Sequence, residues 1–263
     1  MKEKMIFLDI DGTLLDGGEI VYPSTREAIK RAYANGHKLF LCTGRQQCFV
    51  DSQILDMGLL EGVFAAGANV ICDGKMIFHS SFEETLCKKT VELLLNSNSI
   101  FALETVEGAF IHGNMTPEYK EKVGRLLKTK AAFPDELPAS MNQVDKIVVF
   151  QSDYSIEELE KKLGGDFQLV PMSYRFLGYG GEIMQTSLNK ASGIQKILDH
   201  YNLRQEDTIG VGDGANDIEM LEFCNISVAM GNAVEKVKEK ATFVTEHIAK
   251  DGIYHAFDKL RLI

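Results

Sequence analysis

Long apolar runs and paired cysteines are both missing from this sequence. No segment approaches the roughly 18 uninterrupted apolar residues that a membrane span requires. Near the N-terminus, the apolar run at residues 5–8 is short and is followed by Asp9. It is therefore not the apolar region of a signal peptide. The five cysteines contain no C-x-x-C pair and no zinc-like spacing, which is typical of reduced thiols. These absences predict a cytoplasmic protein that does not act on membranes.

An excess of basic residues is also missing. The chain has 28 Lys and Arg against 38 Asp and Glu, a net charge of −10, which argues against a nucleic-acid or anionic-membrane partner. P-loop, G-x-S-x-G and H-E-x-x-H motifs are absent as well. With 45% hydrophobic and 25% charged residues, the 263-residue chain is typical of a globular protein with one large domain or two unequal ones.

Four short apolar runs each end at a polar or glycine-rich turn, as buried strands of a parallel sheet do. They cover residues 5–8, 38–42, 208–212 and 226–230. Helical patterns alternate with them at residues 24–35, 191–200 and 233–240. This alternation predicts a doubly wound α/β domain.

The middle of the chain, from about residue 82 to 185, shows a looser pattern. Helical stretches are predicted at residues 84–96, 117–129 and 156–163, and strands at 100–105, 146–151, 168–171 and 175–177. The last strand lies in a run where polar residues alternate with apolar ones, as in an antiparallel sheet with one wet face. The middle segment is therefore predicted to be an inserted α+β domain.

Unusual polar residues stand at the carboxyl ends of the predicted strands, where open α/β sheets bind ligands. Carboxylates gathered at one sheet edge repel one another unless a cation such as Mg²⁺ neutralises them. An ammonium and a hydroxyl beside that cation describe a phosphate site. The set therefore predicts phosphoryl transfer, and it comprises Asp9, Asp11, Thr43, Lys190, Asp213, Asn216 and Asp217.

These residues fall in four segments that resemble the motifs of the haloacid dehalogenase-like (HAD) phosphohydrolases. The segments are Asp9-Ile10-Asp11-Gly12-Thr13-Leu14, Thr43-Gly44-Arg45, Lys190 and Gly212-Asp213-Gly214-Ala215-Asn216-Asp217. About thirty residues separate the first two motifs and about 145 the second and third, a spacing similar to that of the Cof-like sugar-phosphatase branch with a type 2B cap. The resemblance implies a Rossmann-like hydrolase core at residues 1–81 and 186–263 and a cap at 82–185.

The resemblance also implies a role for each motif residue. Asp9 is expected to attack phosphorus, and Asp11 to act as general acid and base. Mg²⁺ is expected on Asp9, the Asp11 main-chain carbonyl and Asp213. The residues expected to bind phosphate or substrate are Thr43, Gly44, Lys190 and Asn216, with Asp217 and Arg45 in supporting positions.

The predicted function is therefore Mg²⁺-dependent hydrolysis of a small phosphomonoester, a phosphorylated metabolite, through an aspartyl-phosphate. A phosphomutase and a non-catalytic phosphate-binding protein on the same scaffold stay open as alternatives. Residues 210–215 also match the G-x-G-x-x-A dinucleotide motif, but Asp213 in that loop would repel a pyrophosphate. The choice of ester and the choice between monomer and dimer stay open.

Overall fold

The computed structural model describes residues 2–126, 131–134, 136–138, 140–165, 167–171 and 180–263. The chain separates into two compact units. The first consists of Met1–Arg45, Val50–Phe78 and Asn189–Ile263, and the second of Gln46–Phe49 and His79–Leu188. The strand predicted at 175–177 and the end of the helix predicted at 117–129 lie outside the described residues. No described helix is both long and apolar enough to cross a membrane.

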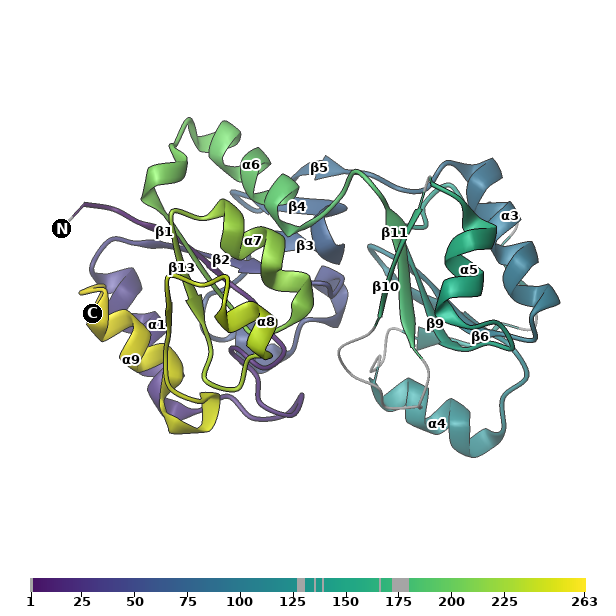
Figure 1. Ribbon diagram of the computed structural model, residues 1–263, viewed down its shortest axis with the longest axis horizontal. Coiled ribbons are helices and arrows are strands. Elements are labelled where there is room, and N and C mark those ends of the chain that lie inside the picture. The colour runs from purple at the N-terminus through teal and green to yellow at the C-terminus, as the bar shows by residue number, and fades with distance from the viewer. Residues whose placement is uncertain (1, 127–130, 135, 139, 166, 172–179) are drawn as a thin grey trace. The chain divides into compact units, whose positions relative to one another are not determined.

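The first unit is built on an eight-stranded sheet (Figure 1). Its order is β14 (Phe243–Val244), β13 (Ile226–Ala229), β12 (Thr208–Gly212), β1 (Met5–Leu8), β2 (Lys38–Cys42), β3 (Gly62–Phe64), β4 (Asn69–Cys72) and β5 (Lys75–His79). Pairing is parallel from β14 to β3 and antiparallel between β3 and β4. The carboxyl ends of the parallel strands therefore meet at one edge of the sheet.

Helices cover both faces of this sheet, because successive residues of a buried strand point to opposite faces. Ile6 and Leu8 of β1 pack with one set of helices, α1 (Pro23–Ala34), α2 (Ser52–Leu55) and α9 (Gly252–Lys259). Met5 and Phe7 pack with the other, α6 (Lys190–Tyr201), α7 (Ile218–Phe223) and α8 (Glu235–Lys238). The predicted doubly wound α/β architecture is confirmed.

The second unit is built on a six-stranded sheet. Its order is β10 (Phe167–Pro171), β11 (Gly181–Gln185), β9 (Lys146–Gln151), β6 (Ile100–Thr105), β7 (Gly108–His112) and β8 (Ala131–Ala132). Among the residues that the structure describes, neighbouring strands pair antiparallel except β7 with β8. Helices α3 (Glu84–Asn96) and α5 (Ile156–Leu163) cover the face that carries Phe101 and Leu103, whereas α4 (Pro117–Leu126) contributes Val123 to the other face. The inserted α+β fold is confirmed.

Residues 46–49 belong to the second unit although they follow β2 of the first. Phe49 is buried in the apolar cluster formed by β6, β7 and β9. The Gln46 side-chain amide donates to the buried Asp145 carboxylate at 3.1 Å. The second unit is therefore assembled from two separate stretches of sequence.

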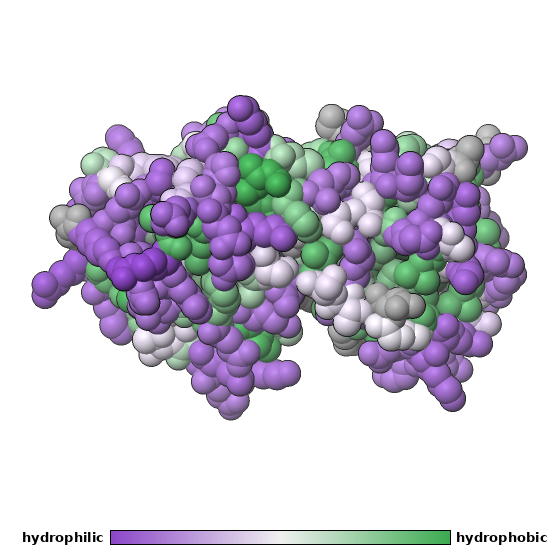
Figure 2. Space-filling model, turned by 90° about the horizontal axis from the view of Figure 1, so that it is seen from above, coloured by the Kyte–Doolittle hydropathy of each residue, from purple (hydrophilic) through white to green (hydrophobic). Residues whose placement is uncertain are grey.

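Hydrophilic side chains predominate on the face of the molecule shown in Figure 2. This agrees with a chain in which one residue in four is charged and acidic residues outnumber basic ones. The apolar residues of both sheets are instead largely enclosed by their covering helices.

Candidate active site

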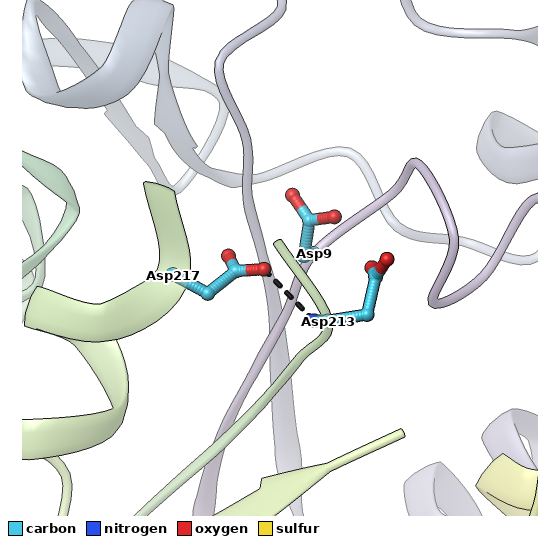
Figure 3. Close-up of side chains that lie close together, drawn as sticks. All are labelled: Asp9, Asp213 and Asp217. Atoms are coloured by element: carbon cyan, nitrogen blue, oxygen red, sulfur yellow. Dashed lines mark hydrogen bonds between the residues drawn. The ribbon is translucent and has the colours of Figure 1, made fainter. Parts of the chain in front are cut away.

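Two acidic residues meet at the carboxyl edge of the first unit's sheet. Asp9 directly follows β1 and Asp213 directly follows β12, and these strands pair in parallel with Leu8 opposite Val211. The Asp9 amide donates to the Val211 carbonyl at 3.0 Å, which extends the pairing by one bond. Figure 3 shows the two side chains leaving neighbouring chain segments on the same side. Their proximity thus follows from the parallel register of the strands.

A third carboxylate, Asp217, completes this group, which we call the aspartate cluster. Asp217 is fully buried, and its Oδ2 accepts from the amides of Asp213 and Gly214, both at 2.9 Å (Figure 3). Gly212 leaves the space for it, because a Cβ there would lie 2.5 Å from Asp217 Cγ. One carboxylate oxygen from each of Asp9, Asp213 and Asp217 lies within 4.8 Å of the other two.

The buried ammonium of Lys190 holds two members of the cluster. Lys190 Nζ donates to Asp9 Oδ1 at 2.6 Å and also to Asp217 Oδ1, and the lysine side chain is 1% exposed. Lys190 is the first residue of α6, whose N-cap Asn189 accepts from the Ser192 amide at 2.8 Å in a capping box. The cap therefore fixes the end of the helix from which the lysine extends.

When all three carboxylates are ionised, the cluster carries more negative charge than Lys190 neutralises, since three carboxylates and one ammonium sum to −3 + 1 = −2. Burial and then Asp217 raise the pKa of Asp9, although Lys190 opposes them. Burial and Asp217 likewise raise the pKa of Asp213 to about 7. Burial opposes the charge of Lys190, but Asp217 and Asp9 outweigh it and raise the pKa of the ammonium. Asp9 and Asp213 are therefore destabilised as anions by their desolvation and by the neighbouring carboxylates.

Asp11 lies outside the aspartate cluster. Its carboxylate is 52% exposed and accepts from Arg45 Nε at 2.8 Å and Arg45 Nη2 at 2.6 Å, a bidentate ion pair. The Arg45 amide donates to Thr43 Oγ1 at 3.1 Å, and Thr43 is buried directly after β2. The second motif thus forms a turn that presents Arg45 to Asp11, with Gly44 at its centre.

The predicted site residues therefore fall into two groups and one separate residue. The aspartate cluster and Lys190 form the first group, and Asp11 forms the second with Thr43, Gly44 and Arg45. Asn216 is half-buried on the turn between Asp213 and Asp217, and a Cβ on Gly214 would lie 2.6 Å from its Oδ1.

Thr13 and Asn232 are not among the predicted site residues, but both contact the site. The buried Thr13 hydroxyl donates to Asp213 Oδ1 at 3.0 Å. Asn232 Nδ2 donates to the Gly12 carbonyl at 2.8 Å. The rule that ligand-site residues follow parallel strands, applied to β13 as it was to β1 and β12, would have drawn attention to Asn232.

The aspartate cluster fits a divalent cation with hard oxygen ligands. Its donors are carboxylate oxygens, the type that Mg²⁺ prefers, and its net charge of −2 matches the charge of one such ion. Asp9 and Asp213 would hold the ion, because Asp217 already accepts from two amides and from Lys190. A cation there would offset the burial and the repulsion by Asp217 that together raise the pKa of Asp213.

Comparison with known proteins gives one consistent answer. Residues 6–257 match the family described as haloacid dehalogenase-like hydrolase. The chain is 30% identical to YkrA of Bacillus subtilis, and the match covers the full length of both chains. YkrA is provisionally named a phosphatase. It is 26% identical to the B. subtilis 5-amino-6-(5-phospho-D-ribitylamino)uracil phosphatase YwtE, over 98% of each chain. A solved HAD subclass IIB sugar phosphatase is 27% identical over 99% of this chain and 100% of its own, with a TM-score of 0.83.

Proposed function

The chain belongs to the haloacid dehalogenase-like hydrolases and is a phosphatase of that family, and from this premise we propose that it hydrolyses small sugar or polyol phosphomonoesters with Mg²⁺ through an aspartyl-phosphate. The substrate class is supported by the relatives, one of which is a sugar phosphatase and another a ribityl-phosphate phosphatase. Both act on a phosphate carried by a polyhydroxylated carbon chain.

In this proposal Asp9 is the nucleophile. One of its carboxylate oxygens attacks phosphorus, a P–O bond to Asp9 forms, and the P–O bond to the alcohol breaks. Lys190 donates to Asp9 Oδ1 at 2.6 Å, which restricts the rotation of the carboxylate and leaves Oδ2 to attack. Because Asp9 is 5% exposed, its carboxylate has little competing water to displace.

Asp11 is the proton donor and acceptor. Its protonated carboxyl gives a proton to the departing alkoxide, and the resulting carboxylate then takes a proton from the water that attacks the phosphoaspartate. That second step breaks the P–O bond to Asp9 and releases inorganic phosphate. The half-exposed position of Asp11 suits both exchanges, and Arg45 orients the side chain between them.

The remaining residues bind and stabilise charge. Thr43, the Gly44 backbone and Lys190 hold the phosphoryl oxygens, and Asn216 contacts the same group from the turn after Asp213. Mg²⁺ on Asp9, Asp213 and the Asp11 carbonyl would supply electrostatic stabilisation of the phosphoryl oxygens. The second unit is proposed to act as a type 2B cap that selects the alcohol part of the ester.

The observation that carries this proposal is the pair of contacts that Lys190 makes with Asp9 and Asp217 inside a cluster of three buried or half-buried carboxylates. The test is phosphate release from a panel of sugar, polyol and other phosphomonoesters, with Mg²⁺ or with EDTA. Wild type is expected to release phosphate only with the metal. Asp9→Asn is expected to lose about a thousandfold or more in kcat, because an amide is no nucleophile.

Asp207→Asn is the matched control, since Asp207 is a buried aspartate paired with Lys2 and Lys4 before β12 rather than after it. It should keep wild-type turnover. Phosphate release by Asp9→Asn at the wild-type rate would contradict the assignment of Asp9 as the nucleophile. Failure of wild type on every ester would favour a phosphate-binding protein instead.

A further inference from the structure

Asn232 joins two segments that are far apart in the sequence. It follows β13 and is half-buried. Its Nδ2 donates to the Gly12 carbonyl at 2.8 Å, and its Oδ1 accepts from the Ile248 amide at 3.0 Å. Both ends of the side-chain amide are therefore used, and each fixes a backbone group.

Gly12 lies in the turn that follows Asp9. Its φ of +86° suits glycine, and its amide donates to the Leu15 carbonyl at 2.9 Å. A Cβ on Gly12 would lie 2.2 Å from Asp213 Oδ2, so the bare backbone of this residue packs directly against the Asp213 carboxylate. A shift of the turn would therefore move or release Asp213.

The segment that carries Asn232 also contacts the loop after β12. The Met230 amide donates to the Gly212 carbonyl at 3.0 Å, and the Val234 amide to the Asp213 carbonyl at 3.3 Å. These two bonds bracket Asn232. The segment between β13 and α8 thus holds the turn of the first motif on one side and the loop of the fourth motif on the other.

We propose that Asn232 is a positioning residue that sets the Gly12 turn, and through it the Asp11 and Asp213 side chains. This inference rests on the proposed function for its kinetic consequences. Gly12 directly follows Asp11, and Thr13, the next residue, donates to Asp213 at 3.0 Å. One side-chain amide therefore controls the geometry between the acid–base residue and a residue expected to hold the metal.

Asn232→Asp separates this role from general support of the fold. The aspartate keeps the oxygen that accepts from Ile248, but it loses the donor to Gly12 and places a carboxylate against a carbonyl. Asn225→Asp is the matched control, because Asn225 precedes the same strand and its Nδ2 donates to the Glu206 carbonyl at 3.0 Å. Both variants exchange one amide for one carboxylate and break one bond to a backbone carbonyl.

Asn232→Asp is expected to lower kcat by roughly tenfold to a hundredfold, because misplacement of about 1 Å has effects of that size. KM for the ester should change by less than about threefold, since Thr43 and Lys190 are untouched. Asn225→Asp should keep both constants within about twofold of wild type. A kcat of Asn232→Asp equal to that of Asn225→Asp would overturn the proposal.

A double-mutant cycle with Thr13→Val shows whether the two residues act through the same turn. If they do, Asn232→Asp should lower kcat much less in the Thr13→Val background than in wild type. A loss that is the same in both backgrounds would mean that Asn232 and Thr13 act independently and not through the same turn, which contradicts the proposal. Comparing the thermal midpoints of all variants ensures that folded protein is compared.

Calorimetric titration with Mg²⁺ alone tests Asn232 without turnover. Asn232→Asp should bind Mg²⁺ about tenfold more weakly than Asn225→Asp, because Asp213 loses its support, and equal affinities would overturn the inference. If wild type hydrolyses no ester, the proposed function fails, and this titration alone then decides for or against the role of Asn232.

Discussion

Asp213 is the member of the aspartate cluster that Lys190 does not contact directly. Lys190 donates to Asp9 and Asp217, whereas Asp213 accepts from the hydroxyl of Thr13. Burial and the neighbouring Asp217 raise the pKa of Asp213 to about 7, far above the 3.8 of an unperturbed aspartate. Folding therefore stabilises the protonated form of Asp213 relative to the anion.

This shift makes a prediction about stability and pH. Between about pH 4 and 7 the folded protein binds more protons at Asp213 than the unfolded chain does, so the stability due to this group is lost as pH rises through 7. Asp213→Asn does not titrate. In EDTA, the free energy of unfolding of Asp213→Asn minus that of wild type should increase from pH 5 to pH 8 by roughly 1–2 kcal/mol, a value reduced for partial exposure. Urea unfolding at the two pH values measures it.

Asp207→Asn is the control for this measurement. Lys2 holds the pKa of Asp207 below its usual value, so this carboxyl stays ionised at both pH values and its variant should show a constant difference from wild type. A difference between wild type and Asp213→Asn that does not change from pH 5 to pH 8 would contradict the raised pKa.

The residues of the aspartate cluster were predictable because a general rule places them. Asp9 and Asp213 directly follow two parallel strands whose apolar runs are clear in the sequence. Parallel pairing places both residues at the carboxyl edge of the sheet. Asn232 and Thr13 act through a carbonyl and a carboxylate whose positions depend on how two loops fold against each other. No local sequence pattern predicts how these loops pack, so the contacts of Asn232 and Thr13 could be identified only in the structure.

At the scale of elements, the start of α6 links helix stability to the site. Asn189 caps the helix whose first residue is Lys190. Asn189→Ala should destabilise the protein by about 1 kcal/mol, as loss of an N-cap usually does. It should also lower kcat by roughly threefold to tenfold, because the backbone that carries Lys190 loses its anchor. Urea unfolding and steady-state kinetics on the same preparation measure both effects.

Ser155 provides the control for Asn189. It caps α5 in the second unit with the same kind of capping box, and its hydroxyl accepts from the Glu158 amide at 3.2 Å. Ser155→Ala should show a similar loss of stability while kcat stays within about twofold of wild type. If both variants lower kcat equally, the cap of α6 has no special relation to the site.

Element boundaries were predictable where the pattern of apolar residues marks them, and they differ where contacts with another segment set them. Residues 5–8 and 38–42 form the predicted strands, and residues 84–96 and 156–163 the predicted helices. The helix predicted at 233–240 is shorter, Glu235–Lys238, because the amide of Ala233 bonds to the Met230 carbonyl and Val234 bonds to Asp213. Strand β3, with three residues, is too short to show a periodicity, and it depends on pairing with β2.

At the scale of the whole molecule, net charge and the aspartate cluster act in the same direction. The chain carries a formal charge of −10, and the fully ionised cluster with Lys190 contributes −2 of this within a few ångströms. Like charges in a compact state repel one another, and the repulsion is strongest where water is excluded. A bound divalent cation should therefore stabilise the folded state in addition to any role in turnover.

Thermal unfolding with and without Mg²⁺ measures this stabilisation. At a concentration 100 times its Kd, an ion that binds only the folded state adds about 2.7 kcal/mol, which corresponds to a rise in Tm of roughly 5–10 °C for a chain of this size. Asp213→Asn should lose most of the rise, and Asp207→Asn should keep it. Because the cluster is largely buried, about 0.5 M NaCl should leave most of the wild-type rise in place, whereas ions attracted only by surface charge would be screened. A rise equal in wild type and Asp213→Asn, and abolished by salt, would assign the effect to the overall charge of −10 rather than to the cluster.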